Sequence, residues 1–181
     1  MHTLSIRRER TAVIAGVVGF ALALAAAAQV ALPLPGTPVP LTLQPLLVVL
    51  AGMMLGPRAG AASMVLYLAA GAAGLPVFAP IGAPGIARLL GPTGGYLLAY
   101  PAAACVAGLL AHRAHGFATR LLAAMAGMLV LYTGGLAQLA LLTGSLERAA
   151  LLGVLPFVAA DAVKAIVAAA LTRPRAAARS L

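Results

Sequence analysis

The chain has 181 residues, of which 63% are hydrophobic and only 8% are charged, and its formal net charge is +9. In a soluble domain about a quarter of the residues are charged, so this composition excludes a soluble globular protein and predicts a single integral membrane domain. The basic residues occur in short clusters between long uncharged runs, which is typical of topology signals and anionic-lipid contacts rather than of a nucleic-acid-binding surface.

The first half of the chain predicts three helices. Residues 11–57 contain no charged residue, and a membrane span needs about 20 residues, so this stretch has room for two passes. Prolines between positions 33 and 40 must interrupt it. We therefore expect helices over 11–32, 42–55 and, after Gly56-Pro57-Arg58, over 59–74. A cleaved signal peptide is the alternative for the first apolar stretch, but the stretch is long for one.

The second half predicts a long loop and three more helices. The loop covers residues 75–95 and is rich in Gly and Pro, and the helices are expected over 96–111, 121–143 and 151–171. Irregular backbone at membrane depth is tolerated only when it is buried in protein or lines a cavity. We therefore expect the loops over 33–40 and 75–95 to cap a pocket at the outer end of the bundle. The simpler alternative is that the prolines only end helices.

The positive charges predict the topology, because cytoplasmic loops carry an excess of Lys and Arg. With six spans and a cytoplasmic N-terminus, only Arg88 and Arg148 fall outside. The arginines on the cytoplasmic side are then Arg7, Arg8, Arg10, Arg58, Arg113, Arg120, Arg173, Arg175 and Arg179. The predicted fold class is all-α, a compact bundle of six transmembrane helices with both termini in the cytoplasm.

Two opposite charges lie inside the last predicted span. Asp161 and Lys164 are the only ionisable residues within 149–172. A charge at mid-membrane costs about 2.5–3.5 kcal/mol, so a functional site is the default hypothesis. On a helix, residues three apart face the same way. A carboxylate accepts and an ammonium donates hydrogen bonds, so the pair can hold a ligand with both N–H and C=O or carboxylate groups. A structural ion pair between helices is the alternative.

The sequence does not predict catalysis. The three histidines, at positions 2, 112 and 115, lie near cytoplasmic ends with too few partners for a metal site or a catalytic triad. Cys105 is the single cysteine, and we interpret it as a packing residue. The glycine run over 91–96 lacks the lysine of a phosphate-binding loop. We expect no enzyme activity, no metal and no cofactor.

Several motifs together resemble one known family. They are Val39-Pro40-Leu41-Thr42-Leu43-Gln44, Leu50-Ala51-Gly52-Met53-Met54-Leu55-Gly56-Pro57-Arg58-Ala59-Gly60, Gly71-Ala72-Ala73-Gly74-Leu75-Pro76-Val77-Phe78-Ala79, Gly91-Pro92-Thr93-Gly94-Gly95-Tyr96, and Pro156-Phe157 followed by Asp161 and Lys164. Over about residues 21–169 the chain resembles the BioY family, the substrate-binding S components of energy-coupling-factor (ECF) biotin transporters. The six membrane helices of that family agree with the charge count.

The resemblance implies a biotin pocket near the outer face, with biotin as the transported substrate and not as a cofactor. It implies that Asp161 and Lys164 make polar contacts with biotin. Further lining residues implied by it are Gln44, Phe78, Gly91, Thr93 and Tyr96. For Arg88, a contact with the biotin carboxylate and a contact with lipid headgroups are both open. At residues 80–85 the family often has a string of glycines, and at position 160 it often has a glycine, whereas this chain has Pro80-Ile81-Gly82-Ala83-Pro84-Gly85 and Ala160. These differences affect the detailed shape of the pocket.

The resemblance also implies partners. S components dock a transmembrane coupling subunit through a small-residue face of the first helix, and Ala21 and Ala25 have the required spacing, although such spacing also arises by chance in an alanine-rich helix. Two ATPase subunits would supply the energy at the bacterial cytoplasmic membrane, and a homo-oligomer stays open. The alternative function is an S component, or a proton-coupled carrier that uses Asp161, for another small vitamin-like solute.

Overall fold

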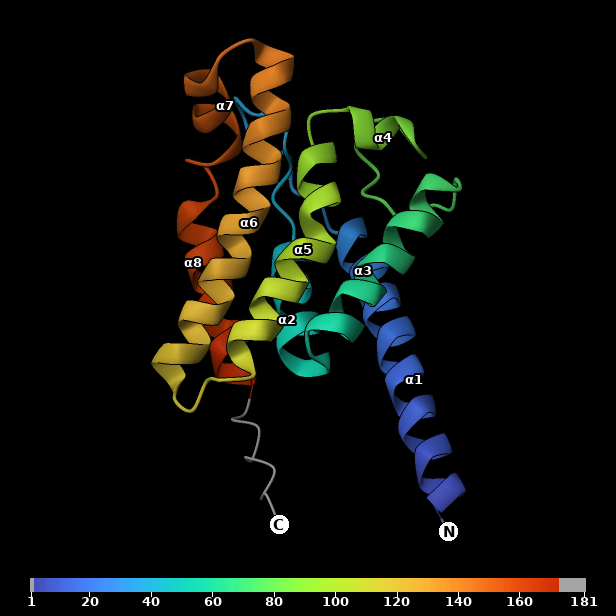
Figure 1. Cartoon of the computed structure of the whole chain (residues 1–181). Coiled ribbons are helices and arrows are strands. Elements are labelled where there is room, and N and C mark those ends of the chain that lie inside the picture. The colour runs from blue at the N-terminus through green and yellow to red at the C-terminus, as the bar shows by residue number, and fades with distance from the viewer. Residues whose placement is uncertain (1, 173–181) are drawn as a thin grey trace.

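A computed structural model describes residues 2–172 of the chain, and that part consists of helices joined by loops, with no β-strand (Figure 1). The helices are α1 (His2–Gln29), α2 (Gln44–Leu55), α3 (Pro57–Ala72), α4 (Ala87–Leu90), α5 (Gly94–Ala111), α6 (Phe117–Thr143), α7 (Leu146–Gly153) and α8 (Val158–Leu171). The predicted all-α class is confirmed.

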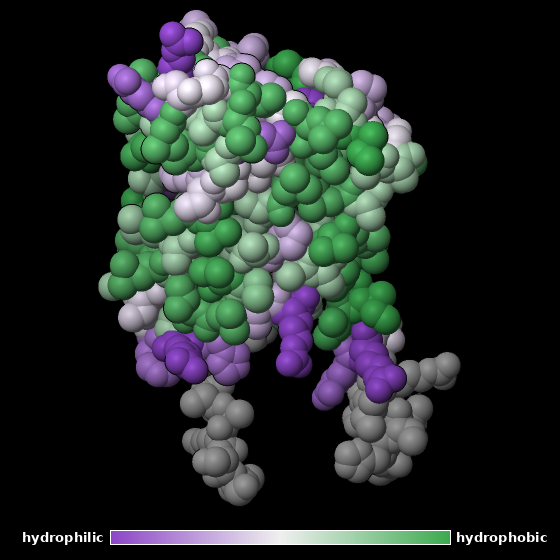
Figure 2. All heavy atoms as spheres, turned by 45° about the horizontal axis from the view of Figure 1, so that its top comes forward, coloured by the Kyte–Doolittle hydropathy of each residue, from purple (hydrophilic) through white to green (hydrophobic). Residues whose placement is uncertain are grey.

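The two ends of the bundle differ. The start of α1 and the end of α8 lie at its lower end in Figure 1, together with the α2–α3 and α5–α6 turns, whereas α4 and α7 lie at the upper end. Arg58 lies at the start of α3, and Arg113 lies in the turn after α5. Figure 2 shows a broad hydrophobic face around the middle of the molecule, with hydrophilic side chains along the lower end and at the upper edge. This distribution is that of a multi-pass membrane protein.

By length and composition, three helical segments of the described chain can cross a membrane. They are Glu9–Gln29, Gly94–Ala111 and Phe117–Thr143, and α7 and α8 together add a fourth although they are bent by 57°. The apolar α2 has 12 residues and is about 18 Å long, shorter than the roughly 30 Å hydrocarbon core. The non-helical backbone before α2 must therefore be sheltered by protein.

The segment 30–43 before α2 is held as a closed loop by two backbone hydrogen bonds. The Leu32 N–H donates to the Leu41 carbonyl at 2.9 Å, and the Leu41 N–H donates to the Leu32 carbonyl at 2.8 Å. Prolines within this loop have no N–H to donate, and the Thr37 hydroxyl adds a contact to the Leu152 carbonyl.

The expected last helix over 151–171 is broken in the structure. Pro156 has no N–H, and its ring clashes with the carbonyl four residues earlier, which is Leu152. The Leu152 carbonyl accepts a hydrogen bond from the Thr37 hydroxyl at 2.6 Å. The next carbonyl, of Gly153, accepts one from the Tyr96 hydroxyl. The break thus ties α7 to the loop over 30–43 and to α5.

Glycines allow the central helices to approach backbone to backbone. A Cβ built on Gly52 of α2 would lie 1.9 Å from the Ala104 carbonyl oxygen of α5. A Cβ on Gly95 of α5 would lie 2.1 Å from the Gly134 carbonyl oxygen of α6. Small residues at such crossings are the usual way in which membrane helices pack tightly.

The α2–α5 crossing predicts the effect of adding one methyl group. Gly52→Ala places a carbon against the Ala104 carbonyl and must push the helices apart, so we expect a loss of about 1–3 kcal/mol of stability. Thermal unfolding of the purified protein in detergent measures it. Gly19→Ala on α1 is the control, because nothing lies within 4 Å of the added carbon there. Equal melting temperatures for Gly52→Ala and the wild type would contradict the packing.

Candidate functional site

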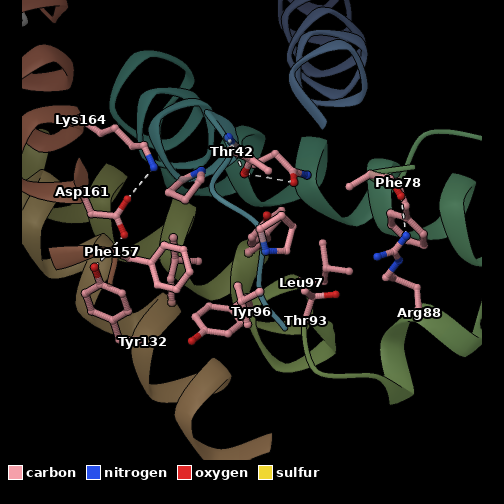
Figure 3. A pocket seen from close by; sticks show the side chains of 17 residues that line it. Thr42, Phe78, Arg88, Thr93, Tyr96, Leu97, Tyr132, Phe157, Asp161 and Lys164 are labelled. Carbon is pink, nitrogen blue, oxygen red and sulfur yellow. Dashed lines mark hydrogen bonds and ion pairs between the residues drawn. The ribbon is translucent and has the colours of Figure 1, made fainter. Parts of the chain in front are cut away.

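A cavity lies between the loops, α5, α6 and α8, and it includes a residue of α4 at the upper end of the bundle (Figure 3). The space within it is about 70 Å³, several times what one ordered water needs. Its wall is formed by Val39, Pro40, Thr42, Gln44, Pro45, Phe78, Ala79, Arg88, Thr93, Tyr96, Leu97, Tyr100, Leu131, Tyr132, Phe157, Asp161 and Lys164. These residues come from segments far apart in the sequence, so the cavity forms only when the bundle is assembled.

One end of the cavity carries a buried ion pair. The Lys164 ammonium donates to Asp161 Oδ1 at 2.7 Å, and the Tyr132 hydroxyl of α6 donates to Asp161 Oδ2 at 2.7 Å. Asp161 and Lys164 are each only 7% exposed. Both lie on one face of α8, because residues three apart are neighbours on a helix. Each carboxylate oxygen therefore has one internal donor and retains acceptor capacity.

The other end of the cavity is formed by Arg88 and Phe78 (Figure 3). The Arg88 guanidinium donates to the carbonyls of Ala79 and Ile81, which lie in the loop between α3 and α4. Its Nε is buried and has no hydrogen-bond partner among the described residues. Burial lowers the pKa of the Arg88 guanidinium, but an arginine remains charged at neutral pH. This end therefore presents a fixed positive charge with an unused donor.

A polar and aromatic cluster supports the middle of the cavity. Gln44 Nε2 donates to the Tyr67 hydroxyl at 2.8 Å, and the Thr42 hydroxyl donates to Gln44 Oε1 at 3.4 Å. Tyr67 is 1% exposed. Its ring meets the Phe78 ring edge to face at 5.4 Å and stacks on the Tyr100 ring at 6.3 Å. Tyr67 thus fixes Gln44, Phe78 and Tyr100, each of which lines the cavity, from behind the wall.

The structure brings seven of the eight predicted ligand-contact residues to this one cavity. They are Asp161, Lys164, Tyr96, Arg88, Gln44, Phe78 and Thr93. Gly91 is not part of the wall. Its carbonyl accepts a hydrogen bond from Gln138 Nε2 of α6 at 2.6 Å, and the same amide donates to the Leu89 carbonyl at 3.0 Å. Gly91 therefore anchors the end of α4 to α6.

Sequence reasoning missed Tyr132. The cost of burying charge does not identify it, because a tyrosine is neutral; the available signal is that a buried tyrosine hydroxyl usually needs a hydrogen-bond partner. Tyr100 could also have been found, because it lies one helical turn after Tyr96 on the same face of α5. Phe157 and Thr42 stand within the quoted motifs but were not predicted to line the pocket.

The two alanines of the predicted docking face on α1 pack against the bundle to different degrees. Ala21 is 7% exposed and belongs to the hydrophobic core, and Ala25 is partly buried against that core. The two alanines pack against the chain's own bundle, where their small size lets α1 lie close. The contact of this pair with a coupling subunit stays a prediction, and the arrangement of helices seen here leaves Ala21 little exposed.

The arrangement can hold an elongated polar ligand. Among the side chains of residues 9–172, no group of three or more His, Cys, Asp or Glu is placed to hold a metal ion. The cavity instead combines a carboxylate and an ammonium at one end, aromatic and apolar walls, and a guanidinium at the other end (Figure 3). A ligand that fits has hydrogen-bonding groups of both kinds, an apolar middle and a negative charge.

The chain matches a known family along nearly its whole length. The model of the BioY family matches residues 1–180. A probable biotin transporter BioY of Pyrococcus horikoshii is 43% identical over 131 residues, which cover 72% of this chain and 76% of that protein. The biotin transporter BioY of Thermotoga maritima is 37% identical over 136 residues, or 75% of this chain and 80% of that protein.

The fold also matches a crystal structure, that of the S-component for biotin from an ECF-type ABC transporter. The TM-score is 0.83, the sequence identity is 23%, and the match covers 90% of this chain and 89% of the other. At this identity the likeness is one of fold. The family match and the relatives show that the chain belongs to the BioY family, as its motifs predict, and that it is a transporter and not an enzyme.

Proposed function

We propose that this protein binds biotin and takes it up across the bacterial cytoplasmic membrane as the S component of an ECF transporter. The observation that carries the proposal is the cavity, in which a buried carboxylate–ammonium pair and a buried guanidinium stand at opposite ends (Figure 3). Biotin has matching groups, because its ureido ring carries two N–H donors and a carbonyl and its side chain ends in a carboxylate. The names of the relatives support the same ligand.

The proposed pose follows from this match. Asp161 accepts from a ureido N–H, and Lys164 donates to the ureido oxygen. Phe78 and Tyr96 flank the apolar ring and chain, while Gln44 and Thr93 complete the wall. The carboxylate of biotin then points toward Arg88, where the unpartnered Nε is buried.

The orientation in the membrane is part of the proposal. We place the end of the bundle that carries the α2–α3 and α5–α6 turns in the cytoplasm, because Arg58 and Arg113 lie there. The cavity then lies toward the outer side, and six spans result if α2 and α3 each count as one and α7 with α8 as one.

A coupling subunit and two ATPase subunits provide the energy, since the site described here has no catalytic group. Lipids surround the bundle, and association with a second copy is compatible with it.

Reconstitution into liposomes tests the function. With coupling and ATPase subunits present, internal ATP should drive uptake of labelled biotin, and the same vesicles without ATP should not accumulate it. A proton-coupled carrier would instead accumulate solute under a pH gradient with the S component alone. Accumulation of that second kind would contradict the proposal.

The ion pair predicts a large effect of Asp161→Asn on biotin binding, measured by calorimetry in detergent. The change removes an acceptor and leaves the Lys164 ammonium buried without its partner, so we expect a loss of about 2–5 kcal/mol, which is about 30-fold or more in Kd. Glu147→Gln is the matched control, because Glu147 is the exposed acidic residue of α7.

A double variant separates binding from folding. Asp161→Asn with Lys164→Met removes both charges, so no buried charge is left without a partner, which is the costly outcome when only one member of a pair is removed. We expect this protein to melt close to the wild type and still to bind biotin poorly. Wild-type affinity in the double variant would show that the pair has only a structural role.

Arg88 is predicted to recognise the negative end of the ligand. Wild-type protein should bind biotin more tightly than its uncharged amide, because a hydrogen bond to a charged group contributes about 1.5–3 kcal/mol. In Arg88→Gln this preference should fall about 10-fold or more, while Arg148→Gln, an exposed arginine of α7, should keep it. If Arg88→Gln weakens both ligands equally, the arginine only orders its loop.

A further inference from the structure

We infer that the Tyr132 and Tyr96 hydroxyls determine ligand specificity, by making the α8 end of the cavity a surface of acceptors that selects a ring with two N–H donors, such as a cyclic urea. The inference rests on the proposed function and deepens it. The evidence for it is the acceptor to which each tyrosine hydroxyl donates its proton. A tyrosine hydroxyl has one proton and two acceptor lone pairs, so once the proton is used the oxygen can only accept.

The proton of Tyr132 is committed to Asp161. The hydroxyl lies 2.7 Å from Asp161 Oδ2, and an ionised carboxylate can only accept, so Tyr132 must donate. Lys164 already donates to the other oxygen, Oδ1. The lone pairs of the Tyr132 oxygen are then the polar groups that this residue can offer to a ligand. Tyr132 lies on a different helix, α6. Its hydrogen bond therefore restrains the rotation of the Asp161 carboxylate.

The proton of Tyr96 is committed in the same way to a backbone carbonyl. The hydroxyl donates to Gly153, the last residue of α7. This carbonyl lacks its usual helical partner, because the Phe157 N–H, four residues later, donates to Val154 at 3.0 Å instead. Because the helix break at Pro156 leaves this carbonyl for Tyr96, the Tyr96 hydroxyl has used its proton. Toward a ligand in the cavity its oxygen can therefore only accept a hydrogen bond.

The Lys164 ammonium is the main donor beside these acceptors. It has three N–H groups and uses one for Asp161. The α8 end thus offers acceptors from Asp161, Tyr132 and Tyr96 and a localised donor from Lys164 (Figure 3). A carbonyl flanked by two N–H groups matches that arrangement. A ring with an acceptor in place of an N–H would set two lone pairs against each other and leave a buried group unpaired, which is strongly unfavourable.

The test compares biotin with its two isosteric cyclic carbamate analogues, in each of which a ring oxygen replaces one ureido N–H. Kd values are measured by calorimetry in detergent. We expect wild-type protein to prefer biotin over at least one analogue by about 100-fold or more. In Tyr132→Phe, biotin affinity should fall about 10-fold, and this preference should shrink by a similar factor, because the opposing lone pairs are gone.

Thr133→Val is the control for Tyr132→Phe. It removes a hydroxyl from the adjacent, exposed position of α6, where the hydroxyl donates to the Val130 carbonyl, so both affinities should stay at the wild-type values. If Tyr132 only ties α6 to α8, its loss weakens all ligands equally and the preference is unchanged, which would overturn the inference.

The measurement on wild-type protein stands even if Tyr132→Phe does not fold. Equal binding of biotin and both carbamates by the wild type would overturn the inference while leaving the proposed function intact. Failure of the wild type to bind biotin at all would contradict the proposed function itself. The two failures are therefore distinguished in one titration series.

Discussion

The structure depends on keeping one carboxylate charged inside an apolar bundle. Asp161 is buried, and an ionised group at membrane depth is stable only when it is paired and hydrogen-bonded. Lys164 meets this need from the same helix face and Tyr132 from the neighbouring helix, both at 2.7 Å. The same two contacts leave acceptor sites on the carboxylate open to the cavity. The requirement that makes the pair stable is thus also the one that makes it able to recognise a ligand.

The irregular parts of the chain complete this site. Loops and breaks leave backbone carbonyls and N–H groups without helical partners, and at membrane depth these groups must be satisfied within the protein. The carbonyls of Leu152 and Gly153, at the break before α8, accept from Thr37 and Tyr96. In the loop after α3, the guanidinium of Arg88 serves the same purpose for two carbonyls. Each of these contacts places a polar side chain, or the loop that carries it, at the cavity wall. The contacts that satisfy the irregular backbone therefore also build the cavity.

Composition was sufficient to predict the helical class, because backbone groups at membrane depth must be satisfied within the chain. Charge spacing was sufficient to predict that Asp161 and Lys164 lie together on one helix face, and the structure places both in the cavity wall. The differences between the structure and the other expectations have physical causes. The predicted helix over 151–171 ignored Pro156, whose effect was masked by a continuous apolar run. Gly91 was assigned to the wall from a motif, but the amide of Gln138, distant in sequence, holds its carbonyl on α6. Spacing along one helix does not reveal which face packs against the rest of the chain, so the burial of Ala21 could not be predicted from it.

The most direct measurement is the structure of the protein with biotin bound. We predict that the ureido ring lies at the α8 end, with an N–H within hydrogen-bond distance of Asp161 and the ring carbonyl near Lys164. The ligand carboxylate should point toward Arg88. A ligand bound in the reverse direction, with its carboxylate at Lys164 and its ring beside Arg88, would contradict the account, as would biotin bound outside this cavity.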